Sequence, residues 1–330
     1  MPTEEPLILP SDPFAIAHAA RLLRQGEVCA FPTETVYGLG ADATNEQAVR
    51  RIFLMKGRPL HNPLIVHVAD VAMARLVVAS WPPRAQQLAE LFWPGPLSLV
   101  LPKAAKVPGV VSAGLDTVAV RIPAHPVALS LLAAAQIPLA APSANRSEAV
   151  SPTTAQHVQR SLPHLGLILD GGSCRLGIES TVVDLSCTPP RLLRPGALPL
   201  RELLQALPDL TWAAWNGHST EAQPSPGLSL RHYAPKAPLF LIDPEDGKRV
   251  TTLPAPRGLV THSPLPDIAP LCAAIEYMPT TPLAYGADLY AALHRLDDRQ
   301  VRSIAVLRPP QDPDFCAIWD RLQRAAQKNA

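Results

Sequence analysis

The chain has 330 residues, of which 47% are hydrophobic, so it is long and apolar enough to bury a large core and to form two domains. Its formal net charge of +1 excludes the broadly basic surface of a non-specific nucleic-acid-binding protein, though not a local basic groove. Proline is frequent, with 39 residues, but forms no repeat, so the prolines indicate turns and strand ends.

The N-terminal segment MPTEEP (1–6) is acidic and lacks the basic and apolar regions of a signal peptide. No uninterrupted apolar run reaches the length that crosses a membrane. The five cysteines are scattered without any C-x-x-C pair, which fits reduced thiols and predicts no zinc site. We therefore expect a cytoplasmic protein without a membrane partner and without a metal held by protein ligands.

Helix and strand patterns alternate over the first 207 residues. Asp12 and Pro13 predict the start of the first helix and Gly26 its end, and Thr44 and Gln47 form a capping box before the second. Further helices are expected at 71–79, 83–92 and 126–135, and strands at 28–31, 64–68, 97–101, 118–122, 138–141, 167–170 and 181–185. This order predicts an α/β domain with a mixed, twisted sheet.

The composition changes near residue 208, where a stretch rich in glycine, proline and serine predicts a linker over 208–237. Its RHYAP segment (231–235) is too rich in aromatic and cationic groups for a passive spacer. A smaller, Rossmann-like α/β unit follows, with strands expected at 239–242, 258–261 and 303–307 and helices near 284–296 and at the C-terminus. The sequence thus predicts a domain at 1–207, a linker at 208–237 and a small domain at 238–330.

Several polar clusters lie where strands or helices are expected to end, which is where ligands bind in open α/β sheets. The run PTETVYGLG (32–40) follows the first strand, the run PSANRS (142–147) follows another, and Lys56 and Arg58 flank the end of the second helix. The spacing of the glycines is not that of a P-loop. Each cluster also has an ordinary structural interpretation, because glycine pairs mark turns and a lysine at a helix end favours the helix dipole.

Arg121 is the sharpest single signal, because it lies in the otherwise apolar strand VAVRI (118–122). An unpaired cation buried there is costly, so it needs an anionic partner, either an internal carboxylate or a bound ligand. Arg194 poses the same question beside a turn. His67 also lies in an apolar strand, where a hydrogen-bonded core histidine is the commoner case.

Together these segments resemble the YrdC-like domain of threonylcarbamoyl-AMP synthases. The matching segments, in order, are PTETVYGLG (32–40), KGRPLHNPLIVHV (56–68), PGPLSLVLP (94–102), VAVRIP (118–123), APSANRS (141–147), ESTVVD (179–184) and RPG (194–196). SPGLSLRHYAPKAPL (225–239) and DRLQRAA (320–326) are similar to the longer, two-domain form. The resemblance implies a YrdC-like twisted open sheet followed by the smaller domain.

The resemblance also implies a nucleotidyl-transfer reaction in which L-threonine, bicarbonate or CO2, and ATP give threonylcarbamoyl-AMP and pyrophosphate. Mg²⁺ is expected with the ATP, held by phosphate oxygens and water. A threonylcarbamoyl transferase complex would pass the group to tRNA beside the anticodon, so contact with tRNA is expected to be indirect. Such a reaction needs positioning and charge stabilisation more than a protein nucleophile.

Site roles follow from the matching positions. The resemblance implies an L-threonine pocket at Thr35, His67, Arg121 and Ser180, with a backbone contact at Ala141. ATP is expected to contact Arg58, Asn62, Thr117, Ser143, Asn145, Ser151, Arg194 and Tyr233, and the catalytic cations are expected to be Lys56 and Arg58. Tyr233 would make the linker a lid that excludes water from the product.

Two other functions remain open. One is a tRNA-binding or double-stranded-RNA-binding module, because Lys56, Arg58, Ser143 and Asn145 predict a basic concavity. The other is an enzyme that handles carbamoyl-adenylate, as related domains do in hydrogenase maturation. Those chains carry acylphosphatase and zinc-finger segments, and we find neither in this sequence.

Overall fold

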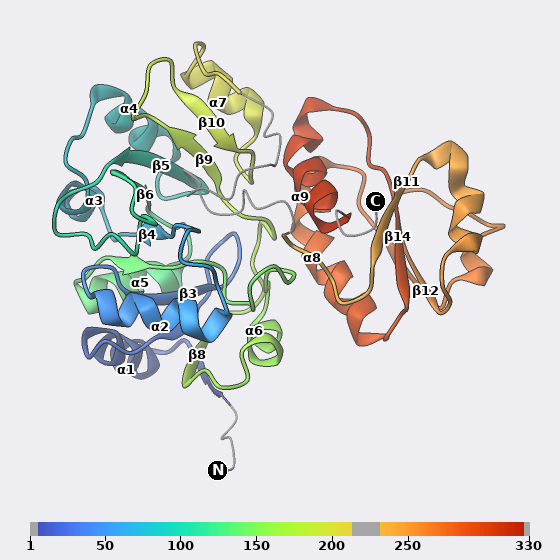
Figure 1. The fold of residues 1–330 in the computed structure, drawn as a ribbon, viewed down its shortest axis with the longest axis horizontal. Helices are drawn as coiled ribbons and strands as arrows, with labels where there is room; N and C mark the ends of the chain where they lie inside the picture. The colour runs from blue at the N-terminus through green and yellow to red at the C-terminus, as the bar shows by residue number, and fades with distance from the viewer. Residues whose placement is uncertain (1–5, 213–231, 327–330) are drawn as a thin grey trace.

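A computed structural model describes residues 6–212 and 232–326, which form two sheets with helices packed on them (Figure 1). The strands of the larger sheet are β1 (Leu7–Pro10), β2 (Cys29–Phe31), β3 (Gly38–Asp42), β4 (Ile65–His67), β5 (Leu97–Pro102), β6 (Thr117–Arg121), β7 (Leu139–Ala140), β8 (Leu167–Asp170), β9 (Thr181–Asp184) and β10 (Arg191–Arg194). Its helices are α1 (Pro13–Arg24), α2 (Glu46–Lys56), α3 (Val71–Val77), α4 (Pro83–Phe92), α5 (Pro126–Ala135), α6 (Ala155–Ser161) and α7 (Leu200–Ala206).

The larger sheet has the order β1-β8-β2-β3-β7-β4-β6-β5-β9-β10. The β1–β8, β8–β2, β4–β6 and β5–β9 pairs are parallel, and the other pairs are antiparallel. The sheet is therefore mixed, as the sequence predicts. The β4–β6 pairing sets His67 beside Arg121, which brings two of the predicted site residues together.

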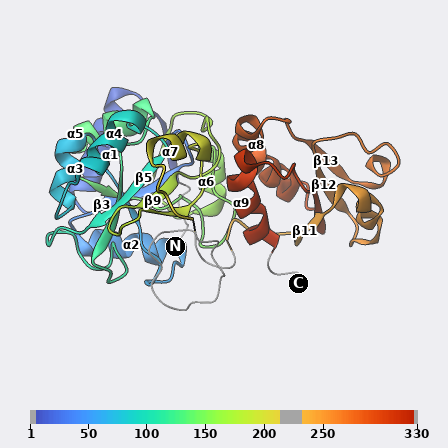
Figure 2. The ribbon, with the colours of Figure 1, turned by 90° about the horizontal axis from the view of Figure 1, so that it is seen from above.

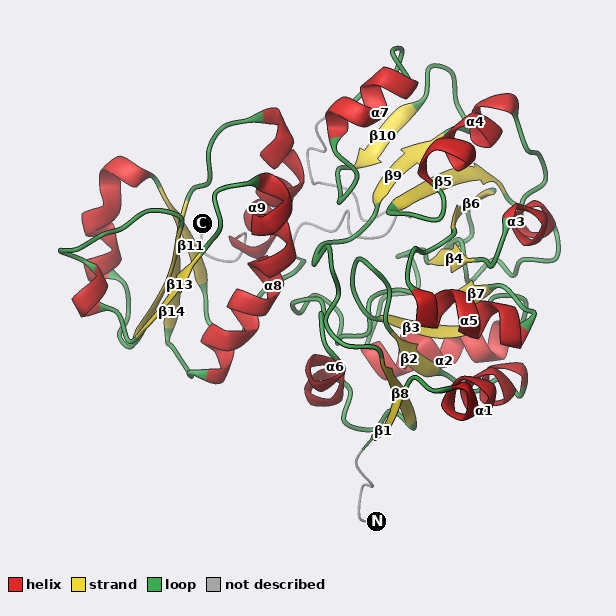
Figure 3. Ribbon diagram, turned by 180° about the vertical axis from the view of Figure 1, so that it is seen from behind, coloured by secondary structure: helices red, strands yellow, loops and turns green. Residues whose placement is uncertain are grey.

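Helices cover both faces of the sheet, because side chains alternate between the faces along a strand. Cys29 and Phe31 of β2 pack into the cluster under α1 and α5, whereas Ala30 between them packs into the cluster that contains α2 residues. Figure 3 shows α1 and α5 close together at this end of the domain. A layered α/β fold follows from this alternation.

The start of α1 is as predicted, with the Asp12 side chain accepting a hydrogen bond from the backbone N–H of Ala15. The predicted cap of α2 is wrong by one residue. Asn45 is the cap, since its side chain accepts hydrogen bonds from the N–H groups of Gln47 and Ala48. The hydroxyl of Thr44 instead donates to Asp42, at 2.7 Å, so it is not available to cap the helix.

The sequence prediction misses β1, β3, β10, α6 and α7. β3 is missed because it begins with Gly-Leu-Gly, and glycine is rare inside strands. Gly40 is nevertheless needed there, because a Cβ atom at this position would lie 2.7 Å from the Phe31 ring. The two glycines of this run therefore allow tight packing of β3 on Phe31.

The smaller sheet is formed by β11 (Leu239–Ile242), β12 (Arg257–Thr261), β13 (Ala274–Tyr277) and β14 (Ser303–Leu307), in the order β11-β14-β12-β13. Its pairings are all parallel. The helical segments beside it are α8 (Pro282–Asp298), α9 (Cys316–Ala326), η1 (Pro244–Thr252), η2 (Ala269–Leu271) and η3 (Pro313–Phe315). The sequence prediction misses β13, which carries a glutamate and little alternation.

α8 and α9 lie between the two sheets (Figures 1 and 2). Val36, Val150 and Ile178 of the larger domain share one buried cluster with Tyr285 and Leu289 of α8. Gly177 has a positive φ of 69°, and a Cβ atom there would lie 2.3 Å from the carbonyl oxygen of Ala287. The smaller domain therefore packs directly behind the segment that leads into β9.

Part of the predicted linker, residues 213–231, lies outside the described residues. The described residues on either side are anchored to the larger domain. Leu192 donates a backbone hydrogen bond to Thr211, and Ala234 donates one to Glu148. Just before Ala234, the backbone N–H of His232 donates to the carbonyl oxygen of Arg324 in α9, at 3.5 Å, and the Tyr233 ring stacks on Tyr290 of α8.

Candidate active site

The loop between β2 and β3 is folded by the hydroxyl of Thr33. Its Oγ1 accepts hydrogen bonds from the N–H groups of Thr35 and Val36, both at 3.2 Å. Thr33, Glu34 and Thr35 are all buried. This turn presents the Thr35 hydroxyl and the Glu34 carboxylate toward the end of β6.

Arg121 finds its anion inside the protein, in the carboxylate of Glu34. Its other contacts are the hydroxyl of Thr35, at 3.0 Å, and the carbonyl oxygen of Gly95, at 3.1 Å. The second oxygen of Glu34 accepts from the backbone N–H of Ala124, at 2.9 Å. The sequence left two anionic partners open for Arg121, an internal carboxylate or a bound ligand, and the structure shows the internal carboxylate.

His67 lies next to Arg121, and its Nδ1 is buried without a hydrogen-bond partner among the described residues. Burial first, and the charge of Arg121 second, lower the pKa of His67 to about 3. The ring therefore stays neutral at physiological pH. A neutral imidazole with an open Nδ1 suits a hydrogen bond to a polar ligand.

Ser180 and Arg194 are joined across β9 and β10. The guanidinium of Arg194 donates to the carbonyl oxygen of Ser180, at 2.9 Å, and to its hydroxyl, at 3.2 Å. The Ser180 hydroxyl also lies 2.8 Å from that of Ser98. These contacts fix the Arg194 cation at the cavity.

Lys56 is the last residue of α2, and Arg58 follows it after Gly57, which adopts a left-handed conformation with φ of 61°. The Lys56 ammonium donates to the carbonyl oxygens of Ser143, at 2.6 Å, and Asn145. Burial, ahead of the charge of Arg58, lowers the pKa of Lys56 well below its usual range. Lys56 thus braces the 143–145 turn from behind.

Arg58 is held by Asn62, whose side-chain oxygen accepts a hydrogen bond at 2.6 Å, and by the carbonyl oxygen of Pro63, at 2.8 Å. Burial is the first cause that lowers the pKa of Arg58 to about 9, and the charge of Arg194 adds to it. Arg58, two residues after α2, and Arg194, at the end of β10, therefore face one cavity. An anionic ligand would relieve their repulsion.

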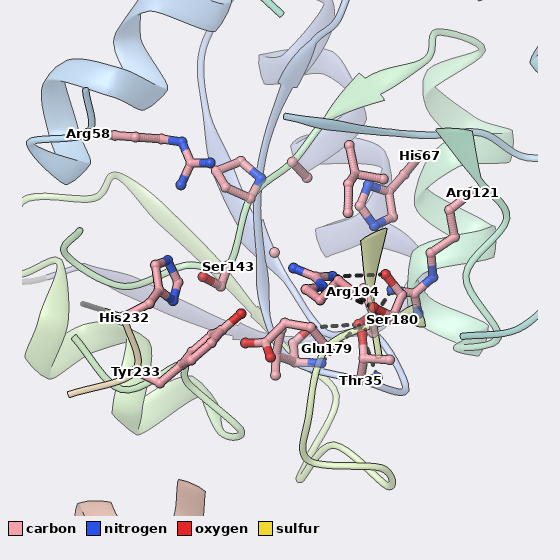
Figure 4. Close-up of a pocket in the computed structure, with 16 residues that line it drawn as sticks. Thr35, Arg58, His67, Arg121, Ser143, Glu179, Ser180, Arg194, His232 and Tyr233 are labelled. Carbon is pink, nitrogen blue, oxygen red and sulfur yellow. Dashed lines mark hydrogen bonds between the residues drawn. The ribbon is translucent and has the colours of Figure 1, made fainter. Parts of the chain in front are cut away.

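His232 and Tyr233 close one side of the cavity (Figure 4). Their rings are 4.0 Å apart, and the Tyr233 ring stacks on Tyr290 with 5.7 Å between centroids. Burial, followed by the charges of Arg58 and Lys56, lowers the pKa of His232 well below its usual range. His232 is therefore neutral while it lies among cations.

The cavity has a volume of about 50 Å³. Its lining residues are Thr33, Thr35, Val36, Gly38, Arg58, Ile65, His67, Arg121, Ala141, Pro142, Ser143, Glu179, Ser180, Arg194, His232 and Tyr233. Of the residues predicted from the sequence, Thr35, Arg58, His67, Arg121, Ala141, Ser143, Ser180, Arg194 and Tyr233 line it. Most of the site residues predicted from the sequence therefore line one cavity.

Five predicted residues do not line the cavity. Asn62 lies behind Arg58, and the Ser151 hydroxyl donates to Glu179 at 2.6 Å. Lys56 braces the 143–145 turn from behind, and the amide nitrogen of Asn145 in that turn donates to two backbone carbonyls. Thr117 lies at the opposite end of β6 from Arg121 and pairs with Pro102.

Sequence reasoning assigned no role to Glu179 or His232, although both line the cavity. The signal for Glu179 was its place immediately before Ser180 at the start of a buried strand. For His232 the signal was its place beside Tyr233 in a linker segment otherwise rich in turn residues.

No group of three or more His, Cys, Asp or Glu side chains gathers to hold a metal within residues 6–212 and 232–326. Over the same residues, no helix has both the length and the apolar character needed to cross a membrane.

Comparisons with known proteins agree with the fold and the motifs. Residues 21–196 match the Sua5/YciO/YrdC family, described as telomere recombination, and residues 199–327 match the C-terminal domain of threonylcarbamoyl-AMP synthase. The threonylcarbamoyl-AMP synthase of Pyrococcus abyssi is 50% identical over 234 residues, covering 70% of this chain and 69% of the relative. That of Bacillus subtilis is 40% identical over 326 residues, covering 94% and 92%.

Two solved structures match nearly the full length of the chain. A crystal structure of P. abyssi Sua5 complexed with L-threonine has a TM-score of 0.90 at 39% identity and covers 97% of both chains. A P. abyssi Sua5 variant with a histidine and the next tyrosine changed to alanine has a TM-score of 0.89 at 38% identity, covering 97% of this chain and 96% of that one. The chain therefore belongs to the threonylcarbamoyl-AMP synthase family of enzymes, in the form with a C-terminal domain after a YrdC-like domain.

Proposed function

We propose that this protein condenses L-threonine, bicarbonate or CO2, and ATP into threonylcarbamoyl-AMP and pyrophosphate. The observation that carries the proposal is that one cavity joins two kinds of group. Hydroxyls and an arginine that is paired with Glu34 line it at Thr35, Arg121 and Ser180, and two further arginines, Arg58 and Arg194, line it as well. The first set suits an amino acid and the second a polyphosphate.

Threonine would bind at the first set. Its carboxylate would accept hydrogen bonds from Thr35, Ser180 and Arg121, with a backbone contact at Ala141, and its polar groups would reach the open Nδ1 of His67. P. abyssi Sua5, a structural relative of this chain, has been crystallised with L-threonine, which supports threonine as the amino acid that is bound.

ATP would bind at the second set, with Arg58 and Arg194 on its phosphates and Ser143 at the turn that Lys56 braces. The threonine amine adds to CO2 and loses a proton to give a carbamate. A carbamate oxygen then forms a bond to the α-phosphorus, and pyrophosphate leaves with the electron pair of the broken P–O bond. Positioning and charge stabilisation carry such a nucleotidyl transfer.

A cavity of about 50 Å³ has room for roughly four water molecules, which is too little for ATP. His232 and Tyr233 occupy the side next to Arg58 and Arg194, so they would move when ATP enters. Once back in place they would shield the hydrolysable product from water, as a lid does.

Mg²⁺ belongs to the proposal as the partner of ATP. The acidic side chain among the described lining residues, Glu179, already accepts hydrogen bonds from Ser151, Tyr290 and Arg321. The residues present therefore fit an ion held by phosphate oxygens and water, and they do not form a protein cage. The product would pass to a threonylcarbamoyl transferase complex acting on tRNA.

The test is pyrophosphate release from ATP by the purified protein with Mg²⁺ and bicarbonate, with threonine present or withheld. We expect release only with threonine, together with threonylcarbamoyl-AMP in the mass spectrum. Threonine-independent release with carbamoyl phosphate as co-substrate would instead favour carbamoyl-adenylate chemistry. RNA binding without any pyrophosphate release would favour the RNA-binding function.

A further inference from the structure

Glu179 places a carboxylate in the wall of a cavity that otherwise carries cations. It is 7% exposed and directly precedes Ser180. One oxygen accepts from Ser151, at 2.6 Å, and the other accepts from Tyr290 and Arg321, both at 2.9 Å. Two of its three partners therefore come from the smaller domain.

Arg321 reaches the site from α9 and is 1% exposed. Besides Glu179 it donates to the carbonyl oxygen of Pro195, at 2.9 Å, and to Asp320, at 2.7 Å. Its guanidinium carbon lies 5.1 Å from the centre of the Tyr233 ring. One buried cation thus contacts the residue before Ser180, the residue after Arg194, and the aromatic side of the cavity.

Tyr290 completes the arrangement from α8. Burial, ahead of the charge of Glu179, raises the pKa of Tyr290 well above its usual range, so its hydroxyl keeps its proton and donates to the carboxylate. Its ring stacks under Tyr233. The smaller domain therefore provides both a charge and a hydrogen bond to the cavity wall.

We propose that Arg321 of the C-terminal domain is a positioning residue of the active site, which neutralises Glu179 so that the cavity accepts anionic reactants. Without Arg321, the Glu179 carboxylate would face the cavity as an uncompensated buried charge. It would then oppose a triphosphate and a carbamate in the same small volume. The proposal gives the C-terminal domain a direct part in the site and rests on the proposed function for the identity of the reactants.

The alternative is that Arg321 only joins the two domains. The two interpretations differ in what happens when the Glu179 charge is also removed. If Arg321 acts by neutralising Glu179, then Glu179→Gln should restore much of what Arg321→Met loses, because no uncompensated charge remains. A residue that acts only as a domain contact gives no such recovery in ligand affinity.

The experiment measures ATP affinity by calorimetry, threonine-dependent pyrophosphate release, and thermal unfolding. The proteins are the full-length wild type, Arg321→Met, Arg321→Lys and Arg321→Met with Glu179→Gln. Arg295→Met is the matched control, since Arg295 of α8 also pairs with two carboxylates, Glu276 and Asp288, but is half-exposed. We expect Arg321→Met to weaken ATP binding by about tenfold or more. The double variant and Arg321→Lys should recover most of that loss.

Unchanged ATP affinity in Arg321→Met would overturn the proposal, and so would a loss that neither Arg321→Lys nor the double variant recovers, or an equal loss in Arg295→Met. If Arg321→Met does not fold, the Arg321→Lys and double variants decide. A wild type that binds ATP without threonine-dependent pyrophosphate release overturns the proposed function alone. A wild type that neither binds ATP nor releases pyrophosphate overturns both.

Discussion

The guanidinium of Arg121 and the carboxylate of Glu34 form an ion pair whose side chains are only 3% and 2% exposed. Glu34 lies in the loop after β2 and Arg121 at the end of β6, so the pair ties together two segments 87 residues apart. The remaining guanidinium nitrogens bind Thr35 and Gly95. Arg121 thus pairs with Glu34 inside the protein and also lines the cavity.

These two roles of Arg121 can be separated by a pair of variants. Arg121→Met should destabilise the fold by about 3–5 kcal/mol, because it leaves the Glu34 carboxylate buried and unpaired. Adding Glu34→Gln should restore much of the stability but not threonine affinity, because the arginine that faces the cavity is still missing. Urea unfolding and threonine calorimetry measure the two effects. Recovery of threonine binding in the double variant would contradict the assigned contact.

Lys56 offers a test of the brace beneath the 143–145 turn. Lys56→Met removes both of its hydrogen bonds to backbone carbonyls, so the turn should loosen and the KM for ATP should rise by about tenfold. The KM for threonine should change much less, because Thr35 and Arg121 are untouched. Steady-state kinetics with each substrate varied in turn gives both values.

The matched control is Lys103→Met, since Lys103 also donates to a backbone carbonyl, that of Val107 at 2.9 Å. Because Lys103 lies outside the cavity lining, the KM values of the Lys103→Met variant should equal those of the wild type. A rise in both KM values for Lys56→Met would mean that Lys56 supports the whole site and does not act through the turn alone.

Helices and strands that consist of a continuous apolar run can be predicted from the sequence. The helix at Pro126–Ala135 and the strand at Leu167–Asp170 have the predicted bounds, because their apolar residues and flanking turn residues are unambiguous. β3 is missed because its glycines serve the approach of Phe31, a contact that only the folded sheet creates.

The same limit applies to the site. Arg121 could be recognised from one strand, because a cation in an apolar run needs a partner wherever the strand goes. Its partner could not, because Glu34 in the loop after β2 meets Arg121 at the end of β6 only through the order of the folded sheet, in which β3, β7 and β4 lie between these two strands. Glu179 went without a role for a similar reason, since its partners Tyr290 and Arg321 lie more than 100 residues away, in another domain.

Tyr233 tests the aromatic side of the cavity. Its hydroxyl is buried without a hydrogen-bond partner among the described residues, so Tyr233→Phe should leave the free energy of unfolding unchanged or slightly raise it. If the hydroxyl contacts the nucleotide, the same variant should weaken ATP binding severalfold. Tyr233→Ala also removes the stacking on Tyr290 and should increase the fraction of ATP that ends as AMP without product.

For these variants the control is Tyr277→Ala, because Tyr277 is 60% exposed on β13. Calorimetry gives the ATP affinity, and chromatography gives the ratio of AMP to threonylcarbamoyl-AMP. An unchanged ratio in Tyr233→Ala would argue against shielding of the product by this ring.

The domain contact at α6 and α8 makes stability depend on pH. The rings of His157 and His294 stack with centroids 3.8 Å apart, and burial is the largest cause that lowers their pKa values to about 3 and about 4. In the unfolded chain a histidine has a pKa of about 6.5. Between about pH 6.5 and 4 the unfolded state therefore binds more protons than the folded state.

Stability should consequently be full above about pH 6.5 and fall as the pH drops toward 4, by at most about 1.4 kcal/mol per pH unit for each histidine. Replacing both residues, as His157→Gln with His294→Gln, should flatten this dependence, while His18→Gln at a partly exposed position of α1 should not. Urea unfolding at several pH values measures the slope. A slope in the double variant equal to that of the wild type would assign the acid sensitivity to other buried groups, such as His67 and His232.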